Sequence, residues 1–250
     1  MNTFSLEIAK IKRRRALPIA LAVMTMAVLW SGMARTDGLA KNPGQASAAL
    51  VVNDLTSLLP MLLPLLVAVT VVRVAGAEQD ADMLSQLFAC GASRTRLLLG
   101  KLTLVAALLA ISLGLGFLVT LGWASAQRIA PDLGLAGQAY LLCLVAALEL
   151  AAPLLVLALR QNRQAAVIGI GLALGLAGQL LALAPRPVLM LLPNTQIAAA
   201  NPTRWILADG YITGYRPAPE QAALIPLVAL IAAVVVGASI RYHSRKEIES

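Results

Sequence analysis

Charged side chains are scarce in this sequence. Only 13% of its 250 residues are Asp, Glu, Lys or Arg, and 59% are hydrophobic. A soluble globular domain has about a quarter charged residues, because it must cover its surface with groups that water solvates. The composition therefore excludes a soluble domain and indicates an integral membrane protein.

Histidine and cysteine are rare as well. The single histidine, His243, is close to the C-terminus, so His-dependent catalytic triads, intramembrane metalloprotease pairs and haem-ligand pairs on the outer side lack their residues. Cys90 is expected in a cytoplasmic loop and Cys143 inside a span, which predicts neither a disulfide nor a metal site. We expect a chain that is not an enzyme and that holds no metal or cofactor.

A phosphate-binding loop is also missing from the sequence. The pattern G-x-x-x-x-G-K-[ST] does not occur, since Gly91 and Gly100 are wrongly spaced and Leu102 follows Lys101. Any ATP-driven work must therefore use ATP and Mg²⁺ bound to another subunit.

Aromatic residues make up only 4% of the chain, although the net charge is +8. A nucleic-acid surface would interleave aromatic with basic residues, whereas the basic residues here stand beside apolar runs and act as topology signals. Fourteen of the twenty Lys and Arg residues fall on the side that both termini share, and six fall on the other. Because basic loops stay in the cytoplasm, we expect both termini there.

Long apolar runs are abundant, and a helix needs about 20 such residues to cross a bilayer. The expected spans lie near 17–34, 55–76, 97–123, 136–159, 164–184 and 221–240. The first run follows basic residues as in a signal peptide, but Ala34-Arg35-Thr36 is a poor cleavage context, so we expect a retained helix. The sequence predicts an all-α, polytopic membrane protein with about six transmembrane helices in one domain, 1–250.

The first sixteen residues have the pattern of an interfacial helix. Phe4, Ile8 and Ile11 recur at helical spacing, and Lys10 and the run 12–15 supply positive charge. We expect a short helix over 1–16 on the cytoplasmic membrane surface. A plain basic anchor gives the same pattern.

The segment EQDADMLSQLFACGASRTRLLLGK, residues 78–101, is the most informative stretch. It contains an apolar stripe of Met83, Leu84, Leu87 and Phe88, preceded by acidic residues that favour a helix start. Gly91 can end this helix, and Ser93 can cap the next one. The pattern predicts an amphipathic helix in a cytoplasmic loop, 78–94, and a generic interfacial helix remains an alternative interpretation.

Several residues inside the expected spans are unusual. Glu149 falls near the middle of the fourth span, where an acidic side chain costs about 2.5–3.5 kcal/mol. It is a candidate for the substrate path. The alternative is a carboxyl group that is hydrogen-bonded between helices and serves packing.

Pro60 and Pro64 should loosen the second span. Gly171 and Gly175 predict a small-residue face for close helix contact.

The opening LEIAKIKRRR and the segment 78–101 resemble the permease subunits of type-two ABC exporters, nearest to lantibiotic-immunity and antibiotic-export permeases. In that family an acidic residue and a Lys/Arg cluster precede the first span. The first cytoplasmic loop has a Leu-rich short helix, then Gly, Ser-Arg and a Lys that opens the third span. The resemblance covers the whole six-span layout.

The resemblance implies a coupling helix that docks into a separate ATPase. The positions implied for this ATPase coupling are Met83, Leu84, Leu87, Phe88, Gly91, Ser93 and Arg94. The implied partners are an ABC ATPase dimer, a second identical or related permease and the lipid membrane, with no nucleic acid. The implied cargo is a hydrophobic or amphipathic antimicrobial peptide, drug or lipid exported across the bacterial plasma membrane. A non-transporting membrane scaffold or sensor is the alternative.

The extracellular segment, 185–220, is too apolar for a long solvated loop. Trp205, Tyr211 and Tyr215 suit a membrane interface. The resemblance implies that this segment forms short re-entrant helices that close the outer exit, whereas an ordinary aromatic anchor is the alternative.

Overall fold

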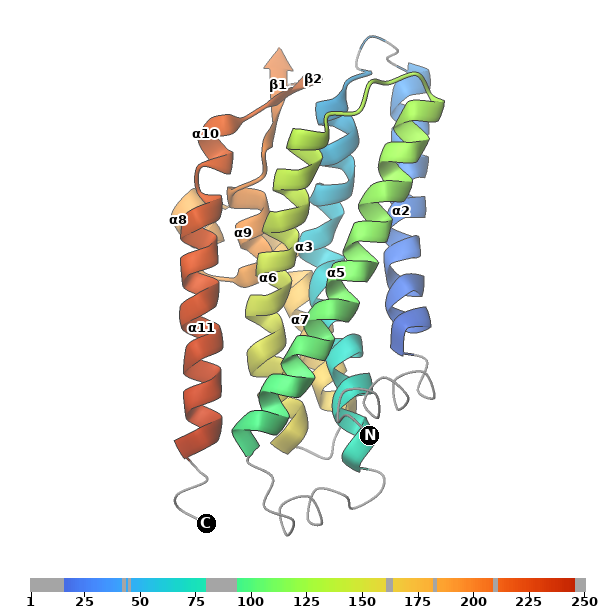
Figure 1. The fold of residues 1–250 in the computed structure, drawn as a ribbon. Helices are drawn as coiled ribbons and strands as arrows, with labels where there is room; N and C mark the ends of the chain where they lie inside the picture. The colour runs from blue at the N-terminus through green and yellow to red at the C-terminus, as the bar shows by residue number, and fades with distance from the viewer. Residues whose placement is uncertain are drawn as a thin grey trace.

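The computed structural model of the protein describes residues 16–41, 44, 46–79, 94–160, 164–181, 184–208 and 211–245. Within these ranges lie six helices that are long and apolar enough to cross a membrane, which confirms the expected fold class. They are α2 (Ala16–Lys41), α3 (Ala48–Gln79), α5 (Arg94–Ala126), α6 (Leu133–Arg160), α7 (Gln164–Leu181) and α11 (Ile225–Arg245) (Figure 1).

The six helices alternate in direction along the bundle. The beginnings of α2, α5 and α7 and the ends of α3, α6 and α11 lie toward one end, which is the lower end in Figure 1. The end of α3 and the beginning of α5, which flank residues 80–93 in the chain, therefore both lie at this lower end. The short connection from α5 to α6 lies at the upper end, together with the segment that precedes α11.

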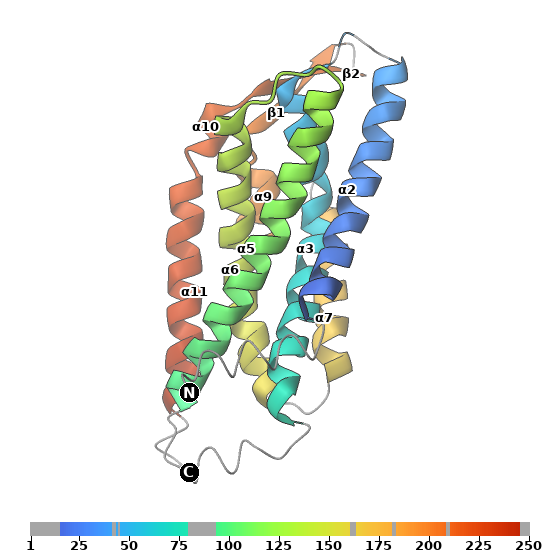
Figure 2. The same ribbon diagram turned by 45° about the vertical axis from the view of Figure 1, so that its right-hand side comes forward.

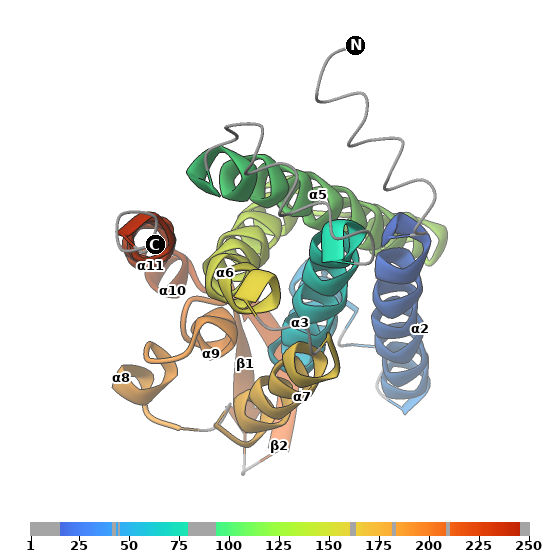
Figure 3. The same cartoon turned by 90° about the horizontal axis from the view of Figure 1, so that it is seen from below.

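Helices α3 and α6 form the centre of the bundle. In each of them, 67% of the apolar stretch that can cross a membrane is buried inside the protein. In the span that contains α11, only 11% is buried. Leu55, Leu59, Leu63 and Leu66 of α3 are almost fully buried, because three- and four-residue steps place them on one face of the helix. Seen from below in Figure 3, α11 stands at the edge beside α6, and α2 stands on the other side of α3.

The helix α7 packs closely on α3 through glycines, as the sequence predicts. A Cβ atom on Gly171 would lie 2.8 Å from the carbonyl oxygen of Pro64, and one on Gly175 would overlap the carbonyl oxygen of Met61. The backbones can approach this closely because neither glycine has a side chain. A Cβ atom on Gly169 would meet nothing within 4 Å, so this glycine lies outside the contact.

The turn between α5 and α6 is stabilised by local capping. Arg128 adopts a positive φ of 60°, and the N–H of Ile129 donates to the carbonyl of Ala124 at 2.9 Å, as at many helix C-termini. The carboxylate of Asp132 then accepts a bond from the N–H of Leu135 at 2.9 Å and caps α6.

The segment between the first two spanning helices is shorter than the sequence indicates. The expected span ends at 34 and the next begins at 55, but α2 continues to Lys41 and α3 begins at Ala48. The reason is that Arg35 of α2 pairs with Asp54 of α3, with 3.2 Å between Nε and Oδ2. The Arg35 guanidinium also lies 4.6 Å from the ring centre of Trp123 on α5, so one buried cation joins three neighbouring helices (Figure 2).

The segment before α11 contains strands as well as short helices. Two helices, α8 (Arg186–Leu189) and α9 (Pro193–Ala199), precede an antiparallel hairpin of β1 (Thr203–Ala208) and β2 (Tyr211–Pro217). A further turn of helix, α10 (Pro219–Ala222), leads into α11. The sequence predicts only helices in this segment, and the hairpin corrects that prediction. Its signal is the dipeptide Asp-Gly between two runs rich in aromatic and β-branched residues.

Candidate functional site

Most of the residues predicted to couple this chain to an ATPase lie outside the described residues. These are Met83, Leu84, Leu87, Phe88, Gly91 and Ser93. The expected interfacial helix of residues 1–16 also lies outside, except for Ala16, which begins α2. Arg94 is the first residue of α5. The coupling role of this segment therefore stays a prediction.

The two helices that flank residues 80–93 are joined at the lower end of the bundle by Lys101. This lysine of α5 is only 2% exposed, and its Nζ donates a hydrogen bond of 3.0 Å to the carbonyl of Val74 on α3. The carbon stem of Lys101 covers apolar surface while its nitrogen reaches this backbone carbonyl. The bond holds α3 and α5 together close to where residues 80–93 begin and end.

Glu149 is buried between α6 and α9. It is 3% exposed, and its Oε1 accepts a hydrogen bond of 3.4 Å from Nε2 of Gln196. The second carboxyl oxygen, Oε2, has no hydrogen-bond partner among the described residues. Glu149 therefore helps to hold α9 against α6 and keeps one acceptor atom available.

A second polar side chain of α9 binds the backbone of α3 at its proline pair. Because Pro64 has no N–H, the carbonyl of Pro60 loses its helical partner. Nδ2 of Asn194 donates to this carbonyl at 2.9 Å and to the carbonyl of Leu174 on α7 at 2.8 Å. Gly178 makes the approach possible, since a Cβ atom there would overlap Nδ2 of Asn194. One amide thus connects α9 to both α3 and α7.

A network of four polar side chains joins α3 to the base of the hairpin. Nδ2 of Asn201 donates to Oγ1 of Thr56 at 3.0 Å, and the Thr203 hydroxyl lies 3.1 Å from Oδ1 of Asn53 and 2.8 Å from Oδ1 of Asn201. None of the four residues is more than 9% exposed. Buried polar groups are tolerated when they satisfy one another, so the network fixes β1 on the upper half of α3.

This network forms one wall of a cavity of about 420 Å³. The cavity lies between α3, α7, the segment around β1 and α10, and most of its lining residues carry amide or hydroxyl groups. Arg204 is the one charged lining residue, and it lies 4.0 Å from Glu220.

On the hairpin, burial and the negative charge of Asp54 raise the pKa of the Tyr215 hydroxyl above its usual value, so Tyr215 stays protonated at neutral pH.

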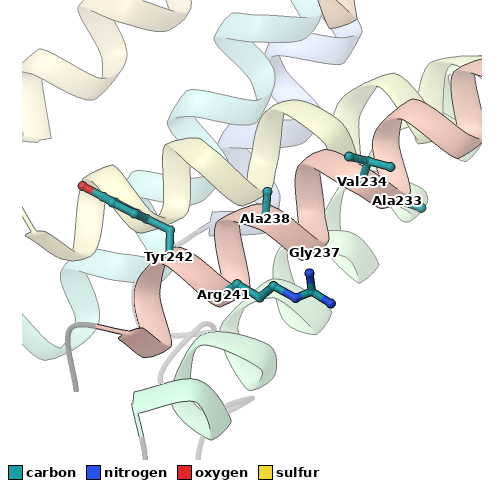
Figure 4. Close-up of a pocket in the computed structure, with 6 residues that line it drawn as sticks. All are labelled: Ala233, Val234, Gly237, Ala238, Arg241 and Tyr242. Carbon is teal, nitrogen blue, oxygen red and sulfur yellow. The ribbon is translucent and has the colours of Figure 1, made fainter. Parts of the chain in front are cut away.

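A different, largely apolar hollow lies along α11. Figure 4 shows Ala233, Val234 and Gly237 on the helix surface, with Arg241 and Tyr242 nearer its end. The Tyr242 ring lies 4.2 Å from the guanidinium carbon of Arg160 on α6. Basic and aromatic residues at the end of an apolar helix are typical of a membrane interface, so this surface faces lipid or another membrane helix.

Sequence reasoning found Glu149 and the glycines of α7 but missed the other residues of these sites. Asn194, Asn201 and Thr203 lie in the segment PNTQIAAANPT, whose amide and hydroxyl residues stand within an apolar context. That context is the signal that could have located them, because uncommon polar residues at membrane depth usually pair with one another.

A bundle of six apolar helices with buried polar contacts defines a polytopic membrane protein. Residues 3–178 match the family described as ABC-2 family transporter protein. The match covers well over half of the chain, and the chain therefore belongs to the ABC-2 transporter family. No curated protein and no solved structure matches the chain significantly.

Membership of this family assigns the chain to the membrane component of an ABC transporter. The resemblance noted in the sequence is thus confirmed at the level of an ABC-2 permease. Such a permease works with an ATPase subunit, which supplies the ATP hydrolysis. The chain itself is a transport component and not the catalytic one.

Proposed function

We propose that this chain is the permease subunit of an ATP-driven exporter in a bacterial plasma membrane, with both termini in the cytoplasm. It moves a hydrophobic or amphipathic cargo, such as an antimicrobial peptide, drug or lipid, and belongs to the lantibiotic-immunity and antibiotic-export group. It pairs with a second identical or related permease, and an ATPase dimer with its own ATP and Mg²⁺ binds residues 78–94. The observation that carries this proposal is the family match over residues 3–178.

The position of the loop supports its role as the ATPase contact. The end of α3 and the beginning of α5 lie at the lower end of the bundle, together with the ends of α6 and α11. Arg96 is close to the beginning of α5, and Arg160 and Arg241 are close to the ends of α6 and α11. Lys41 ends α2 and Arg128 lies in the connection from α5 to α6, so both belong to the opposite end. Because basic residues favour the cytoplasmic side, this distribution supports a cytoplasmic loop.

The segment from α8 to α10 supports an outer gate. The helix α9 packs against α3, α6 and α7, and Asn194 and Gln196 on it are fully buried. A short helix buried among spanning helices on the side opposite the loop is consistent with a re-entrant element that closes the exit. Glu149 remains a candidate for the substrate path, since its Oε2 can accept a hydrogen bond from a cargo donor.

Copurification with a candidate ATPase tests the proposed function. We expect the complex to hydrolyse ATP, and we expect the double change Leu87→Asp and Phe88→Asp to abolish assembly or lower turnover at least tenfold. Leu133→Asp is the matched control, because Leu133 is a 72% exposed leucine at the upper end of the bundle. Unaltered assembly and turnover in the double variant would contradict coupling through the loop and favour a scaffold or sensor.

A further inference from the structure

The cavity beside the hairpin differs chemically from the groove between α2 and α5. The groove between α2 and α5 is lined mainly by apolar side chains, among them Leu21, Met24 and Val28. Of the residues that line the cavity of about 420 Å³, only Pro60 and Ala198 are apolar, and the polar ones include Asn53, Ser57, Gln179 and the charged Arg204. Its volume falls in the range of about 300–1,000 Å³ that is usual for small-molecule sites.

The hydrogen bonds within the wall leave particular groups available to a ligand. Oδ1 of Asn53 accepts from Nδ2 of Asn201 and from the Thr203 hydroxyl, which holds the Asn53 amide in the cavity wall. The Ser57 hydroxyl donates to the carbonyl of Asp54 at 3.1 Å and keeps its lone pairs as acceptors. Gln179 is exposed on α7 and lines the opposite side. The cavity therefore offers uncharged donors and acceptors held by a fixed network.

The charges around the cavity disfavour a strongly ionic ligand. Arg204 is more than half exposed, and both Arg204 and Arg216 lie within 4.0 Å of Oε1 of Glu220. Asp54, next to Asn53 in the chain, is paired with Arg35. One carboxylate faces two guanidinium groups, so one positive charge remains at the rim, but it is solvent-exposed and screened. The buried amides and hydroxyls of the wall therefore decide recognition.

An apolar surface leads away from the cavity along α7. Leu172 and Leu176 are each 49% exposed and lie four residues apart, with Gln179 three residues further on the same face. Gly171 and Gly175, each one position before a leucine of this row, lie on the neighbouring face that packs against α3. A molecule with a polar head at Gln179 and an alkyl chain along the leucines would satisfy both surfaces.

We infer that this cavity binds the uncharged, hydrogen-bonding head group of an amphipathic molecule, with sugar hydroxyls or peptide amides as the recognised groups and the apolar chain along α7. Asn53, Ser57 and Gln179 contact the head group. The inference rests on the proposed function for its place in transport, because it names the chemical class of the cargo. Binding itself requires no ATPase and can be measured on the permease alone.

Protection of a thiol in the cavity tests the inference. The full chain carries Ser57→Cys with both native cysteines replaced by alanine, and a water-soluble maleimide labels it in lipid nanodiscs. Octyl glucoside and octanoyl glycinamide present sugar hydroxyls and peptide amides, while octyl phosphate and octyltrimethylammonium present charges on the same chain length. We expect at least one of the two uncharged probes to give saturable protection. It should do so at a concentration at least ten times lower than either charged probe requires.

Two further variants separate binding from folding. Gln179→Leu changes an exposed side chain, and we expect it to raise the half-protecting concentration about tenfold. Gln138→Leu changes another exposed glutamine, on α6 away from the cavity, and should leave protection unchanged. Any of four results would overturn the inference. They are equal protection by all four probes, stronger protection by octyl phosphate, protection that Gln179→Leu does not weaken, and protection by a second copy of the chain without any probe. If the ATPase fails to couple but selective protection persists, the proposed function fails and the site stands.

Discussion

Among single residues, Glu149 shows most clearly how a polar group is accommodated at membrane depth. Its carboxyl group accepts from Gln196 through one oxygen and has a second oxygen without a partner in the described part of the chain. Leaving a buried polar group unmatched costs about 1–3 kcal/mol, so the free oxygen implies either a structural compromise or a ligand that completes the site.

The substitution Glu149→Gln distinguishes these roles. The amide keeps an oxygen that can accept from Gln196, so we expect normal expression and a thermal unfolding temperature within a few degrees of the unmodified chain. It cannot offer two equivalent carboxyl oxygens, so we expect ATP-driven cargo transport to fall at least tenfold. Unchanged transport with normal expression would remove Glu149 from the mechanism and leave it as a packing contact.

At the scale of elements, the contact between α3 and α7 depends on glycine. Replacing Gly175 with alanine places a Cβ atom against the carbonyl of Met61, which is backbone and cannot rotate away. We expect Gly175→Ala to lower stability by about 1–3 kcal/mol, as is usual for overpacking. Thermal unfolding in detergent micelles measures the effect.

Gly169→Ala is the matched control for this prediction. The position is on the same helix and a Cβ atom there meets nothing within 4 Å. Because alanine favours a helix over glycine by about 1 kcal/mol, this variant should be as stable as the original or more so. Equal losses in the two variants would show that close helix contact is not the reason for Gly175.

The bond between Asn194 and α3 makes a second prediction about elements. Asn194→Ala removes the donor to the Pro60 carbonyl, which should cost about 1–3 kcal/mol because that carbonyl has no helical partner. Pro64→Ala restores an N–H at residue 64 and offers the carbonyl a new donor. Asn194→Ala should therefore cost less in the Pro64→Ala background, by about 1 kcal/mol in a double-mutant cycle of unfolding free energies. Additive effects would contradict this explanation of the contact.

The sequence was sufficient for the helices but not for the segment between α7 and α11. Apolar length alone located the six spans, and glycine spacing predicted the α7 contact, since both depend on local patterns. The spans expected near 17–34 and 55–76 leave Arg35 outside a helix, because its partner Asp54 is nineteen positions away and such a pairing is not visible in a local pattern. The polar network could not be predicted for the same reason, because Asn53 and Asn201 meet only after the chain folds.

For the whole molecule, α3 connects the two ends that matter for transport. Its 32 residues span about 48 Å, with the network around Asn53 and Thr56 at the upper end and residues 80–93 following the lower end. The proline pair and the Asn194 contact lie between them. We propose that α3 transmits the movement of an ATPase bound at residues 78–94 to the outer segment.

The most direct test of coupling through the loop is the accessibility of residue 86. In a chain whose native cysteines are replaced, Gln86→Cys is labelled with a membrane-impermeant maleimide in right-side-out and inside-out vesicles, with and without the copurified ATPase. The account predicts labelling only in inside-out vesicles and at least tenfold slower labelling once the ATPase is bound. Labelling from the outer side, or labelling that the ATPase does not slow, would contradict it.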